Sequence, residues 1–159
     1  FEPVDAAQAG RPGLAVYRLG GDAVDRSQFQ PALVAFDGGP RLLGYHVAPL
    51  DDGTAALFLL WELGEPQPGR YHDLQVQAGW LPPDGGQQLA QASGELAYRP
   101  TEWAPGRLSR EALSWLTLPL PPELPAGARL AVRVVDQANG QPLAAAGSDG
   151  DGWLSLPVP

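Results

Sequence analysis

Apolar and polar residues alternate along several short stretches of the chain. In residues 72–81, Leu74 and Val76 fall on one side and glutamines on the other, and residues 129–136 repeat this pattern. A period of two predicts a strand with one face on a core and one face in water. Residues 54–63 are apolar on both sides, which predicts a more deeply buried strand.

Turn residues separate these runs at short spacing. Asp-Gly-Gly at 37–39 lies between the expected strands 32–36 and 41–47, and Pro-Pro-Asp-Gly-Gly at 82–86 precedes the expected strand 88–96. Such turns predict that the strands on either side pair as antiparallel hairpins. Further strands are expected at residues 13–19, 113–120, 143–146 and 153–158.

These patterns predict an all-β protein. Helical periodicity is confined to one possible turn at 22–30 or 109–115. About eight to ten short strands favour an antiparallel β-sandwich of Ig-like or jelly-roll-like type. Residues 1–12 are expected to form an extended N-terminal arm, and residues 13–159 a single sandwich domain. The expected core consists of Leu43, Tyr45, Leu57, Leu59, Trp61, Leu74, Val76, Trp80, Leu118, Leu130, Val132 and Val134.

Composition narrows the function classes. The chain of 159 residues has the usual size of one domain, and its net charge of −8 opposes binding to a nucleic-acid backbone. Without cysteine it has no disulfide, thiolate zinc site or thiol nucleophile. No apolar run approaches the ~18–20 residues that span a bilayer. Because the chain contains no methionine, we expect that Phe1 is not a native start.

Several motifs occur in a characteristic order. Leu-Leu-Gly-Tyr at 42–45 precedes an apolar strand that ends in Trp61, and a Pro-Asp-Gly turn follows at 83–85. Pro-Thr-x-Trp-x-Pro-Gly occupies 100–106, and Leu-Pro-Leu-Pro at 118–121 then leads through Pro-x-Gly into the next strand. This order resembles the C-terminal soluble β-sandwich region of bacterial membrane proteins of the glycosyltransferase, dolichyl-phosphate-mannose-mannosyltransferase-like kind.

The resemblance covers residues 32–143 and implies a non-catalytic domain on the extracytoplasmic side, in the cell envelope. It supplies no binding residues. In this chain residues 55–60 are wholly apolar where the family carries polar residues. Either both faces of this strand are buried or one face meets a partner. An exposed apolar patch around Phe58 and Leu60 would favour a protein partner.

Catalytic signatures are weak, and we expect no enzyme. A serine triad requires a base, and the chain offers only His46 and His72, without a Gly-x-Ser-x-Gly elbow. His46 is expected on the face opposite the core, and His72 at a core edge. Glycoside hydrolysis requires two facing carboxylates, and spacing alone brings no pair together. An unrecognised hydrolase remains as a minor alternative.

A calcium site is the only metal site that the sequence suggests. Ser-Asp-Gly-Asp-Gly at 148–152 provides Asp149 and Asp151 on a flexible loop, as hard cations prefer. The run lacks the length and closing glutamate of a full calcium loop, and Asp-Gly is also common turn chemistry. A plain turn is therefore favoured. Asp-Asp-Gly at 51–53 is a weaker second candidate.

A glycan is the main candidate among small ligands. Trp103 lies in the loop between two prolines, where an exposed aromatic ring would pack on a sugar. Tyr98, Arg99 and Glu102 are positioned to add hydrogen bonds. The alternative is that Trp103 folds back over the end of the sandwich. The leading expectation is a non-catalytic accessory domain that contacts another envelope protein or domain, with a carbohydrate-binding module as the alternative.

Overall fold

The computed structural model describes residues 2–4, 16–18, 26–38, 40–63, 74–85, 88–96 and 111–158. These residues contain ten β-strands and a single turn of 3₁₀ helix at Arg26–Gln28. None of the described segments forms a helix long and apolar enough to cross a membrane. The strands are β1 Glu2–Val4, β2 Val16–Arg18, β3 Gln30–Ala35, β4 Pro40–Pro49, β5 Thr54–Leu63, β6 Leu74–Leu81, β7 Ala90–Glu95, β8 Glu111–Pro119, β9 Arg129–Asp136 and β10 Leu154–Leu156.

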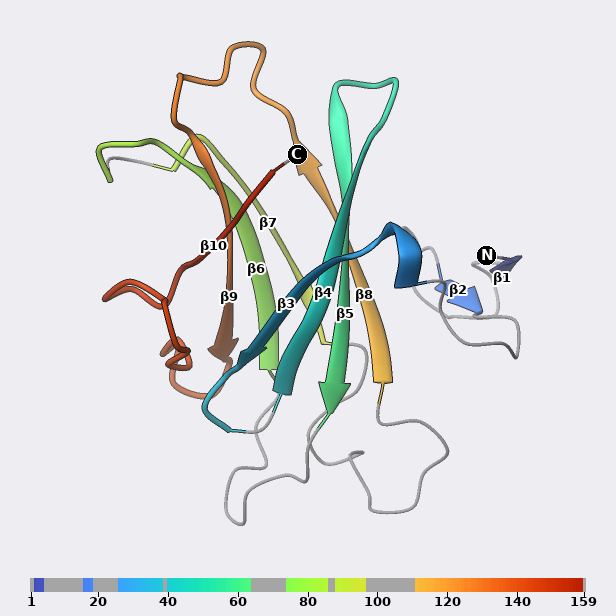
Figure 1. Ribbon diagram of the computed structural model, residues 1–159, viewed down its shortest axis with the longest axis vertical. Coiled ribbons are helices and arrows are strands. Elements are labelled where there is room, and N and C mark those ends of the chain that lie inside the picture. The colour runs from blue at the N-terminus through green and yellow to red at the C-terminus, as the bar shows by residue number, and fades with distance from the viewer. Residues whose placement is uncertain are drawn as a thin grey trace.

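Eight of these strands form two antiparallel sheets that face each other (Figure 1). One sheet has the order β3-β4-β5-β8 and the other β10-β9-β6-β7. The two short strands β1 and β2 pair only with each other. The predicted β-sandwich is confirmed, as are the hairpins β3–β4 and β6–β7. Residues 2–4 of the expected N-terminal arm therefore form a paired strand.

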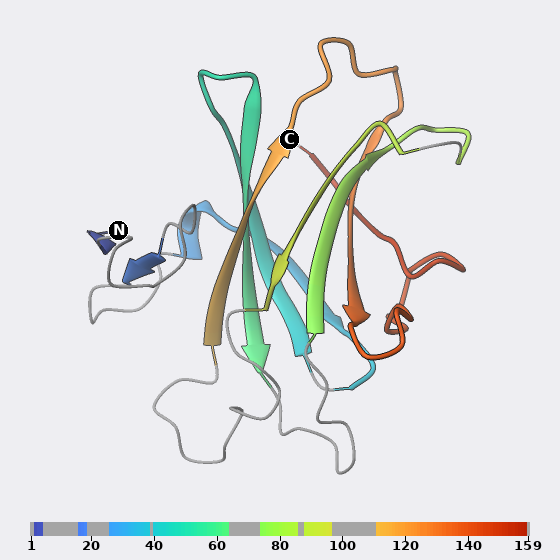
Figure 2. The same ribbon diagram turned by 180° about the vertical axis from the view of Figure 1, so that it is seen from behind.

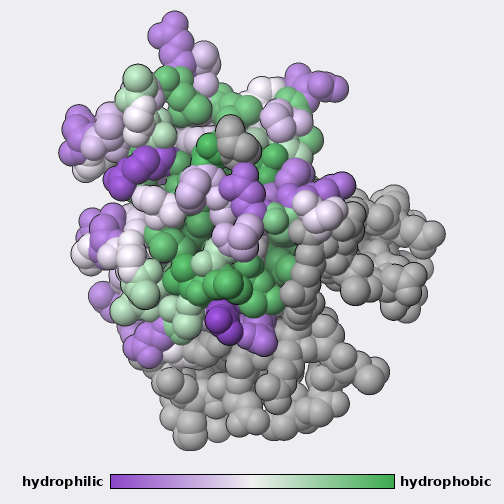
Figure 3. All heavy atoms as spheres, viewed as in Figure 1, coloured by the Kyte–Doolittle hydropathy of each residue, from purple (hydrophilic) through white to green (hydrophobic). Residues whose placement is uncertain are grey.

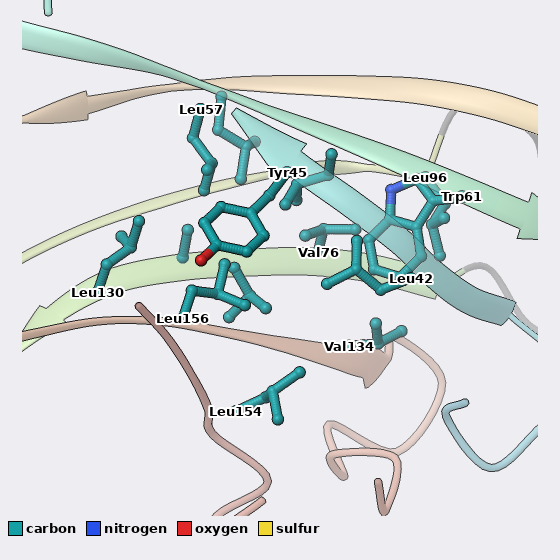
Figure 4. Close-up of a cluster of buried hydrophobic side chains, with 14 of the residues drawn as sticks. Leu42, Tyr45, Leu57, Trp61, Val76, Leu96, Leu130, Val134, Leu154 and Leu156 are labelled. Atoms are coloured by element: carbon teal, nitrogen blue, oxygen red, sulfur yellow. The ribbon is translucent and has the colours of Figure 1, made fainter. Parts of the chain in front are cut away.

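The core lies between the two sheets, where large apolar side chains from both inner faces meet (Figure 4). Trp61, Leu59 and Leu42 enter from one sheet, and Val76 and Leu130 from the other, all nearly inaccessible to solvent. Alternation explains this placement, because every second side chain of a strand points to the same face. Every residue expected in the core is buried except Leu43.

A β-bulge explains the exception. The pairing register between β4 and β5 shifts between Leu42 and Gly44, so one extra residue is inserted into β4. An extra residue interrupts strict alternation. Leu42 and Tyr45 therefore both point into the core, and Leu43 is only half-buried. The sequence pattern placed Leu43 inward because it assumed an unbroken strand.

Two further expectations require correction. Residues 109–115 do not form a helical turn in their described part, because residues 111–115 belong to β8 and pair with β5. The expected strand 143–146 is also wrong. Residues 142–145 instead form a connecting segment that contacts both sheets, with isolated bridges from Ala145 to Phe36 and from Pro142 to Val135. The one 3₁₀ turn lies within the other candidate region, 22–30.

Strands β7 and β8 lie side by side and close one edge of the sandwich (Figure 2). A Cβ atom built on Gly94 of β7 would lie 2.6 Å from Cδ2 of Leu116 in β8. The missing side chain of Gly94 therefore allows the two sheets to approach at this edge. A glycine inside a strand is typical of such close approach.

The opposite edge is held by Tyr45. Its side chain points through the core toward the chain end, and its hydroxyl hydrogen bonds to Gln30 Oε1 at 2.7 Å and to the carbonyl oxygen of Pro157 (Figure 4). Pro157 follows β10, the edge strand of the other sheet. One side chain of β4 thus connects β3 with the segment that leaves the second sheet.

Candidate functional site

Three strand connections meet at one end of the sandwich, at the top of Figure 1. They are the turn 50–53 between β4 and β5, the loop 82–89 between β6 and β7, and the loop 120–128 between β8 and β9. Strand pairing brings them together, because the start of β5 pairs with the end of β8 and the end of β6 pairs with the start of β9. We call the described residues 50–53, 82–85, 88–89 and 120–128 the loop end.

Each connection is fixed by its own hydrogen bonds. The N–H of Leu50 donates to the carbonyl oxygen of Thr54 at 2.9 Å. The N–H of Leu89 donates to the backbone carbonyl oxygen of Trp80, also at 2.9 Å. The N–H of Ala128 donates to the carbonyl oxygen of Pro125, also at 2.9 Å. Proline is frequent in the two longer loops and limits their unfolded conformations. The described part of each connection therefore has a defined shape.

Contacts between the connections hold them in a fixed arrangement. The N–H of Leu120 donates to the carbonyl oxygen of Gly53 at 3.0 Å, which joins the β8–β9 loop to the β4–β5 turn. A Cβ atom on Gly127 would lie 3.3 Å from Cβ of Pro83, so the β8–β9 loop also packs on the β6–β7 loop. The three connections form one continuous surface.

Each of the three connections exposes a leucine on that surface. Leu50 is 40% exposed, and Leu89 and Leu124 are each 39% exposed. Exposed prolines lie beside them at 83, 122 and 125. Hydrophobic and hydrophilic residues alternate at this end in the space-filling view (Figure 3). A single exposed leucine is ordinary on a protein surface, but a group of apolar residues at one end indicates a contact surface.

Only acidic residues carry charge at the loop end. Asp51, Asp52, Asp84 and Glu123 are exposed there, and the three connections contain no arginine or lysine. Asp52 Oδ1 accepts hydrogen bonds from the N–H of Thr54 at 3.1 Å and from its hydroxyl at 2.5 Å. The hydrogen bond from the Thr54 hydroxyl is the main cause of the lowered pKa of Asp52. The lowered pKa keeps the Asp52 carboxylate ionised. The surface therefore combines exposed apolar residues with carboxylates.

A row of aromatic rings crosses the outer face of the β3-β4-β5-β8 sheet. Ring centroids are separated by 6.2 Å between Phe29 and His46, 6.0 Å between His46 and Phe58, and 6.3 Å between Phe58 and Trp115. The last three residues are direct cross-strand neighbours, whose side chains regularly pack together. The rings therefore have packing partners within the sheet.

The outer face around Phe58 is largely covered. Leu60 is only 2% exposed and Ala56 is 3% exposed, so Leu60 does not contribute to an exposed apolar patch. Phe29 lies over Gly44, which is the cross-strand partner of Leu60. Of the two explanations for the wholly apolar stretch 55–60, burial on both faces accounts for Ala56 and Leu60.

The two aspartates considered for calcium lie in the turn between Gly147 and Trp153. Asp149 Oδ1 accepts the N–H of Asp151 at 3.0 Å and the N–H of Trp153 at 2.8 Å. These bonds stabilise the turn from within, as aspartate side chains commonly do. The described part of the chain contains no group of three histidine, cysteine, aspartate or glutamate residues able to hold a metal ion.

Other expected site residues have different outcomes. Tyr98, Arg99, Glu102 and Trp103, which form the predicted glycan site, lie outside the described residues, as does His72. His46 lies on the outer face, as expected, between the rings of Phe29 and Phe58.

The sequence pattern did not reveal the loop end. Leu50, Leu89 and Leu124 each stand alone among turn residues and give no local signal. Their common feature is position in the fold, which depends on the pairing of distant strands. Comparison with known proteins adds no assignment, because no family model, curated protein or solved structure matches the chain.

Proposed function

We propose that this protein is a non-catalytic, extracytoplasmic accessory domain that contacts another envelope protein through the loop end. One observation carries the proposal: one leucine is exposed on each of three connections that contact one another. Covering such apolar area contributes about 25 cal/mol per Å² before the costs of association. Loops that are already fixed by proline and hydrogen bonds lose little further entropy on binding.

The charge of the loop end indicates the kind of partner. Each of its connections carries at least one exposed carboxylate beside the apolar residues, and none contains an arginine or lysine. Complementary charge at the rim guides association and opposes wrong partners. We therefore infer a protein surface with an apolar centre and a rim of arginine or lysine. An anionic lipid surface or a nucleic acid would be repelled.

The motif order from Leu42 to Gly127 supports the placement in the envelope, because it resembles sandwich regions attached to membrane glycosyltransferases. Such regions are non-catalytic accessory domains. The loop end is then the surface through which the sandwich is oriented against its neighbour.

The test begins with a photo-crosslinking amino acid at Leu124 of the full-length protein in membranes of its native host. The same label at Leu33, a 61% exposed leucine of the β3 edge, is the matched control. The proposal expects one protein to be captured from position 124 and not from position 33. The captured protein is then purified for affinity measurements.

Calorimetry with that protein compares three forms of the domain. Leu50→Ser combined with Leu124→Ser is expected to weaken binding by about tenfold or more, because two apolar anchors are lost. The control variant Leu33→Ser is expected to bind the captured protein with the same affinity as the unsubstituted domain. Equal affinity for all forms, or equal crosslinking from both positions, would show that the loop end is not the contact surface.

A further inference from the structure

Arg133 is held firmly on the outer face of the β10-β9-β6-β7 sheet. The central carbon of its guanidinium lies 4.4 Å from the centroid of the Trp153 ring. Its Nε donates to Gln77 Oε1 at 2.8 Å, and its Nη1 donates to the carbonyl oxygen of Asp151 at 3.1 Å. Gln77 Nε2 in turn donates to Gln75 Oε1 at 2.9 Å. Ring, amide and carbonyl together fix the position of the cation.

This cation has no carboxylate partner among the described residues. Arg133 contacts a ring, an amide and a backbone carbonyl, which are all neutral. Arg129 on the same face donates to the hydroxyl of Ser155 at 3.1 Å. Arg41, in contrast, forms an ion pair with Glu62 at 3.6 Å. Within the described part of the chain neither Arg133 nor Arg129 forms an ion pair, which is notable in a protein with a net charge of −8.

The neighbours of Arg133 in the sheet are polar side chains of a kind that can hydrogen bond to the hydroxyls of a sugar. In the sheet register Gln77 lies between Arg133 of β9 and Ser93 of β7, so the three side chains form a row across the face. Gln75 and Gln91 lie on the same face, and the side chain of Gln88 packs over Gly79 beside them, because a Cβ atom on Gly79 would lie 2.3 Å from Gln88 Nε2. Glutamine and serine both donate and accept hydrogen bonds, as sugar hydroxyls do.

We propose that this face binds an acidic carbohydrate, with a uronate carboxylate on Arg133 and neighbouring hydroxyls on Gln77 and Ser93. A guanidinium matches the two oxygens of a carboxylate, and its stacking on Trp153 orients it before the ligand arrives. A neutral sugar would leave the charge of Arg133 unmatched. Arg129 lies four residues along β9, about 13 Å away at the usual rise of a strand, where it meets a second acidic unit of a chain.

An acidic peptide fits this face less well. Extended peptides gain affinity by adding to the free edge of a sheet. Strands β6 and β9 lie inside their sheet, and their backbone groups are paired on both sides. The face therefore offers side-chain amides and hydroxyls in place of backbone groups.

Calorimetric titration with tetragalacturonate tests the inference, with a neutral galactose oligomer of equal length as the control ligand. Arg133→Gln is expected to weaken uronate binding by about tenfold or more, since it removes the fixed cation. Arg133→Lys keeps the charge without the planar fork and is expected to lose several-fold. Arg41→Gln removes the same charge elsewhere and is expected to change affinity by less than about twofold.

Several results would overturn the inference. They are no saturable uronate binding at millimolar concentration, equal binding of the neutral oligomer, or equal losses in Arg133→Gln and Arg41→Gln. Equally tight binding of oligoglutamate would also overturn the inference, because it would show a general carboxylate site and not a site for an acidic carbohydrate. Thermal unfolding of each variant confirms that it is folded before titration. The site is separate from the loop end, so Leu50→Ser combined with Leu124→Ser is expected to retain uronate binding.

Discussion

Replacement of Gly94 by alanine tests how closely β7 and β8 approach each other. The new Cβ would lie 2.6 Å from Cδ2 of Leu116, well inside van der Waals contact. Leu116 is 5% exposed and packs in the core, so its side chain has little room to move away. Overpacking of this kind costs about 1–3 kcal/mol.

Part of this cost is offset, because a glycine inside a strand is itself destabilising by ~0.5–1 kcal/mol relative to alanine. We therefore expect Gly94→Ala to lower the free energy of unfolding by about 1–2 kcal/mol. In a domain of this size that corresponds to roughly 2–4 °C in Tm for each kcal/mol. Urea unfolding followed by tryptophan fluorescence measures the change.

A double-mutant cycle separates the steric contact from other effects. Leu116→Ala alone leaves a cavity and is expected to cost about 2–5 kcal/mol. In Leu116→Ala the Gly94→Ala change meets no methyl group, so it is expected to be neutral or stabilising there. Gly150→Ala is the control, because no atom lies within 4 Å of its Cβ position. Additive effects of the two substitutions would refute the proposed closure of this edge.

Two further predictions concern the hydrogen bonds at Tyr45 and Asp52. Tyr45→Phe leaves the acceptor oxygens of Gln30 and Pro157 without the hydroxyl donor, so the free energy of unfolding is expected to fall by about 1–3 kcal/mol. Urea unfolding measures this change, and an unchanged free energy of unfolding would show that Tyr45 does not tether the chain end. Burial raises the pKa of Tyr45, so its contribution is complete below the unfolded pKa of about 10 and declines as the pH rises through the higher folded pKa. The pKa of Asp52 is lowered chiefly by the Thr54 hydroxyl, so its contribution is present above the unfolded value of about 3.9 and disappears as the pH falls through the lower folded pKa. Asp52→Asn should remove that acid-dependent loss, and an NMR titration that places the Asp52 pKa at or above the unfolded value would contradict the assignment.

The fold was predictable where local patterns and tertiary structure agree. Alternation identified β6 and β9, and the apolar run identified β5. Strands β5 and β9 have the expected bounds. The prediction failed at Leu43, because one inserted residue reverses the side-chain direction without changing composition. It also failed at residues 142–145, which make only two isolated bridges, one from Pro142 to the nearby Val135 and one from Ala145 to Phe36, which is distant in sequence.

The contact surfaces were less predictable than the fold. Leu50, Leu89 and Leu124 share a surface only because separate strand pairs bring their turns together. Arg133 acquires its environment from Gln77 and Trp153, which belong to distant segments. A single sequence gives the chemistry of each side chain, but the spatial grouping requires register and topology.

The segment 142–145 has a consequence for synthesis on the ribosome. Phe36, the residue after β3, bridges to Ala145, and the N–H of Asp37 donates to the carbonyl oxygen of Ala144 at 2.8 Å. These partners emerge roughly a hundred residues later, a separation that makes closure slow. The β3–β4 hairpin must therefore wait with its apolar side uncovered while most of the chain is translated. During this interval the nascent chain is open to aggregation or to capture by a chaperone.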